Sequence, residues 1–133
     1  EVARCCYQAA LAYAPDINIF VLAATEMETV VRALGCSWSG EIFADRAYMP
    51  DGQLAPRSRP DAMIHDPDIA LSHSLTMLTE HRITAIDGTT LPITPHSLCV
   101  HGDGASAVAM AKHLQAGLTN AGLTAKTLPE MML

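Results

Sequence analysis

Hydrophobic residues in the first part of the chain follow a helical spacing and then a strand-like one. Residues 2–14 place apolar side chains at steps of three and four, which predicts a helix; these positions are Val2, Cys6, Ala9 and Tyr13. Pro15 interrupts this pattern. The β-branched and apolar run over residues 17–23 then predicts a buried strand.

A second helix, a second strand and a long loop follow. The segment Thr25-Glu-Met-Glu28 matches a capping box, so we expect a helix over residues 26–34, and Gly35 is typical of a helix end. A short strand is predicted over residues 41–44. Residues 45–61 contain three prolines and an Asp-Gly turn, and loops of this length in compact domains are usually functional or disordered.

The rest of the chain predicts two helices and two strands. Asp66 and Pro67 are typical of a helix start, and this helix carries Leu71, Leu75 and Leu78 on one face. Strands are predicted over residues 82–86, closed by an Asp-Gly turn, and 97–101. A last helix is expected to end at Gly122, with a buried stripe of Ala107, Ala111, Leu114, Leu118 and Ala121.

This alternation of helices and strands indicates the α/β class. It predicts a mostly parallel sheet covered by helices. At 133 residues, the chain is expected to be a single domain over residues 1–133. The predicted strands are too few to close an eight-stranded barrel, but they suffice for about half of one.

Composition narrows the classes of function. Half of the residues are hydrophobic and 5% are aromatic, which fits a folded domain and argues against disorder. The net charge of −6, with no cluster of Lys or Arg, argues against a nucleic-acid partner, and no apolar run approaches the roughly 20 residues that cross a bilayer. Cys5 and Cys6 lie in a helical pattern without C-x-x-C spacing, so we expect buried thiols.

Charged and aromatic residues gather where the strand over residues 41–44 gives way to the loop. They are Asp45, Arg46 and Tyr48, with Arg57 and Arg59 farther along the loop. A carboxylate at the C-terminal end of a strand suits a general base or a metal ligand, and arginine suits a substrate carboxylate. The alternative is that Asp45 and Arg46 form an ion pair that pins the loop, with Tyr48 packed beneath it.

A second candidate cluster follows the strand over residues 97–101. His101 and Asp103 lie two residues apart, so their side chains point the same way if the chain stays extended. Such a pair suits proton transfer, a shared metal or the orientation of an amide. The alternative is a tight turn in which Asp103 caps the following helix. No Walker pattern is present, so this glycine-containing loop is not by itself an ATP site.

Two motifs resemble those of the LamB/YcsF family. The family pattern F-A-D-R-x-Y-x-x-D-G-x-L-x-x-R is matched at Phe43, Ala44, Asp45, Arg46, Tyr48, Asp51, Gly52, Leu54 and Arg57. The family pattern C-x-H-G-D is matched at Cys99, His101, Gly102 and Asp103. The likeness extends from the strand near Phe20 to the helix that ends near Ala121, which is nearly the whole chain.

The resemblance implies a distorted (β/α) barrel of the glycoside hydrolase/deacetylase type. It also implies the cytoplasmic, ATP-coupled cleavage of 5-oxo-L-proline to L-glutamate by the first of three 5-oxoprolinase components, with partner subunits B and C. A lactam amide is unreactive, so ATP is expected to activate its carbonyl oxygen before water attacks. The implied roles are catalysis for Asp45, His101 and Asp103, and substrate binding for Arg46, Tyr48 and Arg57; a metal ligand set is left open.

The chain also departs from the family pattern. Family members are longer, and their first half carries an opening D-L-N-x-D-x-G-E strand, an H-x-G-D motif and a K-P-H-G loop, none of which occurs here. We therefore expect this chain to be the C-terminal half of a LamB/YcsF barrel and to be inactive alone. Two rival functions are a metal-dependent amidase or deacetylase that needs no ATP, and a non-catalytic assembly subunit.

Overall fold

The computed structural model describes residues 1–131, which contain helices α1–α5 and strands β1–β5. In chain order the elements are α1 (Val2–Tyr13), β1 (Ile19–Leu22), α2 (Glu26–Leu34), β2 (Trp38–Phe43), α3 (Pro67–Glu80), β3 (Arg82–Thr84), β4 (Thr90–Pro92), β5 (Ser97–Cys99), α4 (Ala107–Asn120) and α5 (Leu128–Met131). Within the described residues, no helix has the length and hydrophobicity that crossing a bilayer requires.

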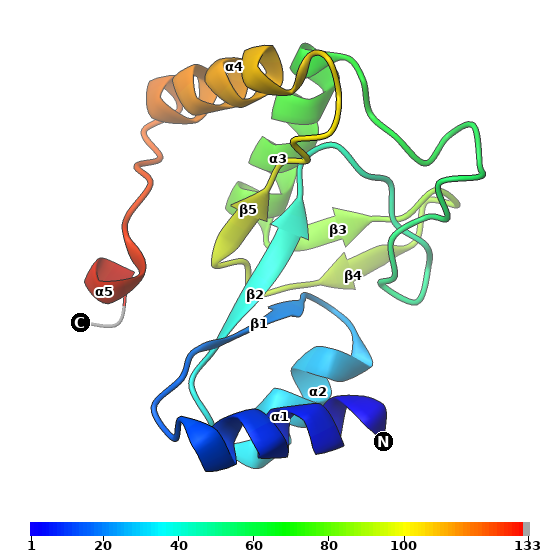
Figure 1. Cartoon of the computed structure of the whole chain (residues 1–133). Coiled ribbons are helices and arrows are strands. Elements are labelled where there is room, and N and C mark those ends of the chain that lie inside the picture. Colours follow the sequence, from blue (N-terminus) through cyan, green and yellow to red (C-terminus); the bar gives the residue numbers. More distant parts are fainter. Residues whose placement is uncertain (132–133) are drawn as a thin grey trace.

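A three-stranded parallel sheet lies at the centre of the molecule (Figure 1). The strand order is β1-β2-β5, with Ile19 opposite Trp38 and Ile42 opposite Leu98. Helices α1 and α2 lie on the side of β1, whereas α3 and α4 lie toward the end of the sheet at which β2 and β5 finish. The predicted α/β class and the mostly parallel pairing are confirmed in this sheet.

Three apolar clusters hold these layers together. The cluster of Ile19, Val21 and Val31 packs β1 against α2 and receives Tyr7 and Leu11 from α1. A second cluster joins the sheet to α3 and to the β3–β4 hairpin; its buried members are Ala23, Ile42, Tyr48, Met77, Ile83 and Ile93. A third cluster packs α3 against α4 through Ala44, Ala70, Met110 and Leu114. The second and third clusters both reach the end of β2, so this strand end is anchored on two sides.

Capping residues set the starts of two helices as the sequence predicts. The Thr25 hydroxyl group accepts a hydrogen bond from the Met27 N–H at the start of α2, and Gly35 ends that helix with φ 65°. The Asp66 carboxylate accepts hydrogen bonds from the N–H groups of Asp68 and Ile69 at the start of α3. The predicted bounds of α2 are therefore confirmed, because local polar groups determine them.

The strand predicted over residues 82–86 is confirmed for residues 82–84 only, as β3. The strand ends at Thr84 and pairs with β4 in a separate antiparallel hairpin, and β4 was not predicted. Gly88 has φ 87°, and the Ala85 N–H donates to the Thr89 carbonyl oxygen, so the Asp-Gly turn folds the chain back on itself. Strand β4 has only three residues, which is too short for an alternation of apolar and polar side chains to be visible in the sequence.

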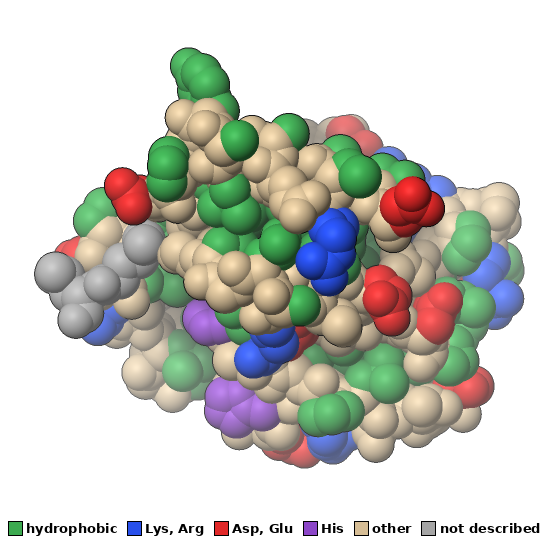
Figure 2. Space-filling model, turned by 90° about the horizontal axis from the view of Figure 1, so that it is seen from below, with side chains coloured by type: hydrophobic (Ala, Val, Ile, Leu, Met, Phe, Trp, Pro, Cys, Tyr) green, Lys and Arg blue, Asp and Glu red, His purple; other side chains and the backbone are tan. Residues whose placement is uncertain are grey.

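The helix predicted over residues 2–14 is confirmed as α1, but the expectation that its cysteines are buried is wrong. Val2 and Tyr13 are 77% and 93% exposed, and Cys5 and Cys6 are exposed. The helix packs through Tyr7 and its neighbours instead. Alanine-rich helices have little contrast between their faces, so spacing alone does not identify the buried one. Figure 2, which views the molecule from the side of α1 and α2, shows hydrophobic side chains at this surface.

Helix α4 is present, but the predicted alanine stripe is partly wrong. Leu114 is buried together with Met110, whereas Ala111 and Ala121 are exposed. Gly117 faces Leu71 of α3 so closely that a Cβ atom added there would overlap the leucine side chain. The close approach of α3 and α4 therefore rotates the buried face of α4 away from the alanines.

A single glycine places the loop after β2 against the end of β1. Gly52 has φ 82°, and a Cβ atom added to it would overlap the backbone carbonyl oxygen of Ala24. Gly88 has a similar φ of 87°, but no atom lies within 4 Å of the corresponding Cβ position. The two glycines therefore share a backbone conformation and differ in the space around them.

We expect Gly52→Ala to destabilise the protein more than Gly88→Ala. Both changes place alanine at positive φ, which costs about 1–2 kcal/mol. Only Gly52→Ala adds a clash with backbone, which raises the cost by about 1–3 kcal/mol. Chemical denaturation of the two variants measures this difference. Equal losses in the free energy of unfolding would contradict the close approach at Ala24.

Candidate active site

The candidate site lies where β2 and β5 end. The two strands are adjacent and parallel, and the Ala44 N–H donates to the Cys99 carbonyl oxygen at 3.0 Å just beyond the last paired residues. Asp45 and His101 lie one and two residues farther along their segments. Parallel pairing therefore places both predicted motifs at one edge of the sheet, which is the edge where ligands of α/β folds bind.

Asp45 and His101 form a direct hydrogen-bonded pair. The Nδ1 atom of His101 lies 2.8 Å from Oδ1 of Asp45, and the backbone N–H of His101 donates to Oδ2 at 3.1 Å. The side chains of His101 and Asp45 are 22% and 9% exposed. A carboxylate only accepts hydrogen bonds, so Nδ1 carries a proton, and in a neutral imidazole Nε2 then has the lone pair. The pair can therefore hold a histidine ready to accept a proton at Nε2.

Arg46 does not pair with Asp45, so the hypothesis of an Asp–Arg loop pin is wrong. Arg46 is 6% exposed, and its Nη2 atom donates to the backbone carbonyl oxygen of Ala55 at 2.6 Å. Consecutive side chains of extended backbone point to opposite sides, and residue 46 is paired in extended fashion with Met63. The buried Nε atom of Arg46 has no hydrogen-bond partner within residues 1–131.

Tyr48 lies inside the protein beneath the site. It is 0% exposed, and its hydroxyl oxygen accepts a 2.7 Å hydrogen bond from the N–H group of Phe43 at the end of β2. Burial raises the pKa of Tyr48 well above its usual value, so the phenol stays neutral. The packing of Tyr48 beneath the loop, one of the two interpretations of the sequence, matches this position.

Arg57 and Asp103 link the two loops at the rim of the site. Nη1 of Arg57 lies 3.0 Å from Oδ2 of Asp103, and the two side chains are 52% and 63% exposed. The chain bends after His101 instead of staying extended. The side chains of His101 and Asp103 therefore have different partners: His101 contacts Asp45, and Asp103 contacts Arg57. Helix α4 begins after Ser106 without a side-chain cap, so the hypothesis that Asp103 caps this helix is wrong.

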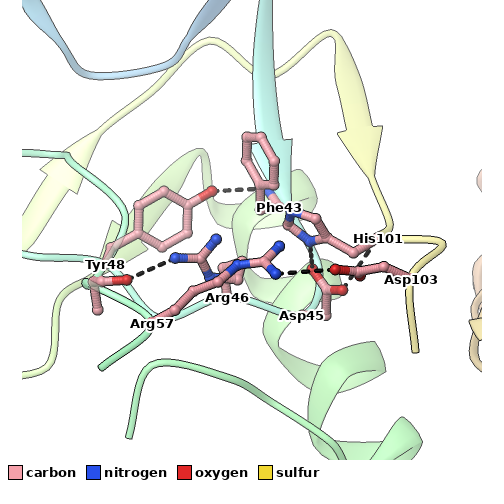
Figure 3. A network of polar contacts seen from close by, with 8 residues as sticks. Phe43, Asp45, Arg46, Tyr48, Arg57, His101 and Asp103 are labelled. Atoms are coloured by element: carbon pink, nitrogen blue, oxygen red, sulfur yellow. Dashed lines mark hydrogen bonds and ion pairs between the residues drawn. The ribbon is translucent and has the colours of Figure 1, made fainter. Parts of the chain in front are cut away.

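Figure 3 shows how these residues are arranged. The guanidinium group of Arg57 points to Asp103, that of Arg46 points to the carbonyl oxygen of Ala55, and the Asp45–His101 pair is drawn next to Asp103. Arg57 holds the pKa of Asp103 below its ordinary value, first through the hydrogen bond and then through its charge. The arrangement therefore combines a histidine–carboxylate pair with one exposed arginine, Arg57, that can bind an anion.

Two contributors to the site had no signal in the sequence. The carbonyl group of Ala55 holds Arg46, and the N–H group of Phe43 holds Tyr48. The sequence could not indicate these contacts, because every residue has backbone groups.

Cys99 lies near the site and is a residue type that often acts as a nucleophile, but it has no such role here. Burial and the charges of Glu41 and Asp45 raise the pKa of its thiol, so Cys99 is protonated and unsuited to act as a nucleophile.

A metal ion does not fit the residues described. Within residues 1–131, no three His, Cys, Asp or Glu side chains come together closely enough to bind one. Both oxygens of Asp45 already contact His101, and Asp103 is held by Arg57.

Two surface hollows of about 300 and 280 Å³ lie away from the candidate site. One is between α3 and β3, and the other is near His96 and α5.

Comparison with known proteins identifies relatives of this chain. The model of the LamB/YcsF family matches residues 1–133. The A subunit of 5-oxoprolinase from Ruegeria pomeroyi is 48% identical over 124 residues, which cover 93% of this chain and 49% of that protein. The corresponding 5-oxoprolinase component from Oceanobacillus iheyensis is 38% identical over 123 residues, which cover 92% of this chain and 48% of that protein.

A solved structure is also similar. The crystal structure of a lactam utilization protein from Thermus thermophilus matches with a TM-score of 0.80 and 34% sequence identity, over 93% of this chain and 49% of that one. The chain thus spans about half the length of the curated relatives and of the solved structure that it matches.

We expect Tyr48→Phe to destabilise the protein by about 1–3 kcal/mol, because the buried N–H group of Phe43 loses its acceptor. Tyr13→Phe is the matched control, since Tyr13 is 93% exposed and should tolerate the loss of its hydroxyl group. Urea denaturation of both variants measures the free energies of unfolding. A Tyr48→Phe variant as stable as the control would contradict the role of this hydrogen bond.

We expect Arg57→Gln to raise the pKa of Asp103 toward its ordinary value of 3.8, because Arg57 is the main cause of the lowered pKa. A lowered pKa means that the ion pair favours the folded state above that ordinary value, and that the benefit disappears as pH falls through the lowered pKa. Carboxyl-carbon NMR titration measures the change. The pKa of Asp61, which pairs with Arg59 instead, should stay unchanged.

Proposed function

This chain belongs to the LamB/YcsF family, and from that premise we propose that it provides part of the active site of the first component of a 5-oxoprolinase. The reaction is the cleavage of the lactam 5-oxo-L-proline to L-glutamate, coupled to the hydrolysis of ATP. The curated 5-oxoprolinase relatives and the solved lactam utilization protein support this function. These relatives are named as one lettered component of an enzyme, which supports a complex; we assign subunits B and C as partners in the cytoplasm.

We propose that the complete protein is a distorted (β/α) barrel of which this chain forms about half. The central sheet supports this proposal, because β1 and β5 each pair with one strand only within residues 1–131. One face of the sheet is also open: Phe20 is 44% exposed, and Glu41, Phe43 and Cys99 are partly exposed. Parallel sheets are normally covered on both faces, so further chain is expected to cover this one.

The hydrogen bond between Asp45 and His101 is the observation that carries the catalytic proposal. Asp45 orients the imidazole ring and keeps the proton on Nδ1. Nε2 of His101 then accepts a proton from the water that attacks the lactam carbonyl carbon, and the C–N bond of the ring breaks as the nitrogen gains a proton. Asp103 is assigned as the second catalytic carboxylate, because it lies at the same rim.

Arg57 is assigned to the carboxylate of 5-oxoproline. It is half exposed at the rim and can be reached by a ligand, whereas Arg46 is almost fully buried. Arg46 then contributes its positive charge and holds the loop through Ala55. Tyr48 is assigned to supporting the loop from below instead of contacting the substrate, because its hydroxyl group is already bonded inside the core.

ATP acts here as a co-substrate whose binding residues we assign to other parts of the complex. The sequence lacks the G-x-x-x-x-G-K-[ST] pattern that surrounds phosphate groups in P-loop proteins. The lactam amide is stabilised by resonance, so coupling to ATP hydrolysis supplies the driving force for activating its carbonyl group. No catalytic step is assigned to a metal ion, because the described donors do not fit one.

The test of this function uses the protein at its natural length, mixed with its partner subunits. We expect glutamate to be released from 5-oxoproline only when ATP is present. Asp45→Ala should lower kcat by about 10²–10⁴-fold, because His101 loses the group that orients it. Asp61→Ala is the matched control, since Asp61 is an ion-paired carboxylate of the same loop that contacts Arg59 and not His101.

Each alternative function predicts a different result. Release of glutamate without ATP would indicate an amidase that needs no nucleotide. Full activity of Asp45→Ala would show that the Asp45–His101 pair is not required for catalysis. A non-catalytic assembly subunit would show normal activity in both Asp45→Ala and His101→Ala, while changes at its surface would prevent the complex from forming.

A further inference from the structure

The ion pair between Arg57 and Asp103 joins two loops that are distant in sequence. Arg57 lies in the loop after β2 and Asp103 in the loop after β5, 46 residues farther along the chain. These are the loops that carry Asp45 and His101. The ion pair therefore crosses the rim of the site, and a ligand carboxylate that takes Nη1 of Arg57 competes with Asp103 (Figure 3).

The contact between Arg57 and Asp103 is weak in its geometry. A guanidinium group can bind a carboxylate through two parallel hydrogen bonds, but here a single bond joins Nη1 to Oδ2. Both side chains are more than half exposed, at 52% and 63%. Exposed ion pairs contribute little to stability, because water solvates both charges well. The Asp103 carboxylate is thus a replaceable partner for Arg57.

The charges around this ion pair favour a further anion. Arg46 is 6% exposed, and no ion pair holds its guanidinium group within residues 1–131. Arg46 and Arg57 both belong to the loop after β2, and Asp45 is already held by His101. A buried positive charge without a carboxylate partner is costly, so the charge of Arg46 favours an anion near this loop, while Arg57 is the arginine that a ligand can reach.

We propose that the Arg57–Asp103 ion pair is the unliganded state of a carboxylate-binding subsite, in which the carboxylate of the ligand replaces that of Asp103 on Arg57. Asp103 thereby acts as an internal competitor for the ligand. The identity of the ligand as 5-oxoproline rests on the proposed function, whereas the competition rests on the geometry of the ion pair.

Replacement of Asp103 also connects binding with chemistry. Arg57 lowers the pKa of Asp103, so separation from Arg57 raises that pKa and makes the carboxylate a better proton acceptor. Asp103 is then free near His101, from which it is two residues away in the chain. A lactam without a carboxylate leaves Asp103 on Arg57. The subsite therefore selects lactams that carry a carboxylate.

A double-mutant cycle tests the competition directly. The protein at its natural length, with its partner subunits, is titrated with 5-oxoproline by calorimetry in four forms: wild type, Asp103→Asn, Arg57→Gln and the double variant. We expect Asp103→Asn to bind about two- to fivefold more tightly, because no internal partner competes for Arg57. Arg57→Gln should bind about tenfold or more weakly, through loss of a charge-assisted hydrogen bond. The double variant should bind 5-oxoproline with the same affinity as Arg57→Gln alone.

Two controls separate replacement from a general effect of charge. Asp61→Asn removes the same charge from a similarly exposed ion pair, with Arg59, and should leave the affinity unchanged. The neutral ligand 5-oxoprolinamide has the same ring without a carboxylate, and Asp103→Asn should not change its affinity. A gain from Asp103→Asn that persists without Arg57 would show simple repulsion of the ligand and overturn the proposal.

The outcomes also separate this inference from the proposed function. Binding of 5-oxoproline that depends on Arg57, without any release of glutamate, would reject the reaction and support the subsite. Equal affinities of wild type and Arg57→Gln would reject the subsite, even in an active enzyme. A wild-type complex that binds neither 5-oxoproline nor its amide would overturn both.

Discussion

The pairing of β2 with β5 is the constraint on which the rest of the site depends. The two strands are parallel and adjacent, although α3 and the β3–β4 hairpin lie between them in the chain. Their register brings Asp45 and His101 within hydrogen-bond distance. Because a shift of one residue would turn each side chain to the other face of the sheet, the register decides whether the pair forms at all.

Buried polar contacts keep the loop after β2 in a single arrangement. Tyr48 accepts a hydrogen bond from Phe43, and Arg46 donates one to the carbonyl oxygen of Ala55, so both side chains tie the loop to itself and to the strand end. These two contacts satisfy the phenol of Tyr48 and Nη2 of Arg46, whereas Nε of Arg46 has no partner within residues 1–131. The loop that carries the candidate site is for this reason part of the core, even though it contains no regular secondary structure.

The site combines a fixed interior with an exposed rim. Asp45 and His101 are mostly buried and hold one another in place, as orientation of a proton acceptor requires. Arg57 and Asp103 are more than half exposed and are joined by one hydrogen bond. In the proposed reaction, the buried pair orients the proton acceptor and the exposed rim binds the charged ligand. The buried pair and the exposed rim lie side by side because the loops after the adjacent strands β2 and β5 carry both.

The sequence by itself determined the α/β class, the bounds of α2 and the two motifs that contain the candidate residues, because caps, glycines and apolar runs act over a few residues. It did not determine which charged groups pair. Asp45 faces His101 and not Arg46, and Asp103 faces Arg57, since strand register and the bend after His101 set these contacts. The exposed face of α1 and the β3–β4 hairpin were likewise decided by tertiary packing, which local spacing does not contain.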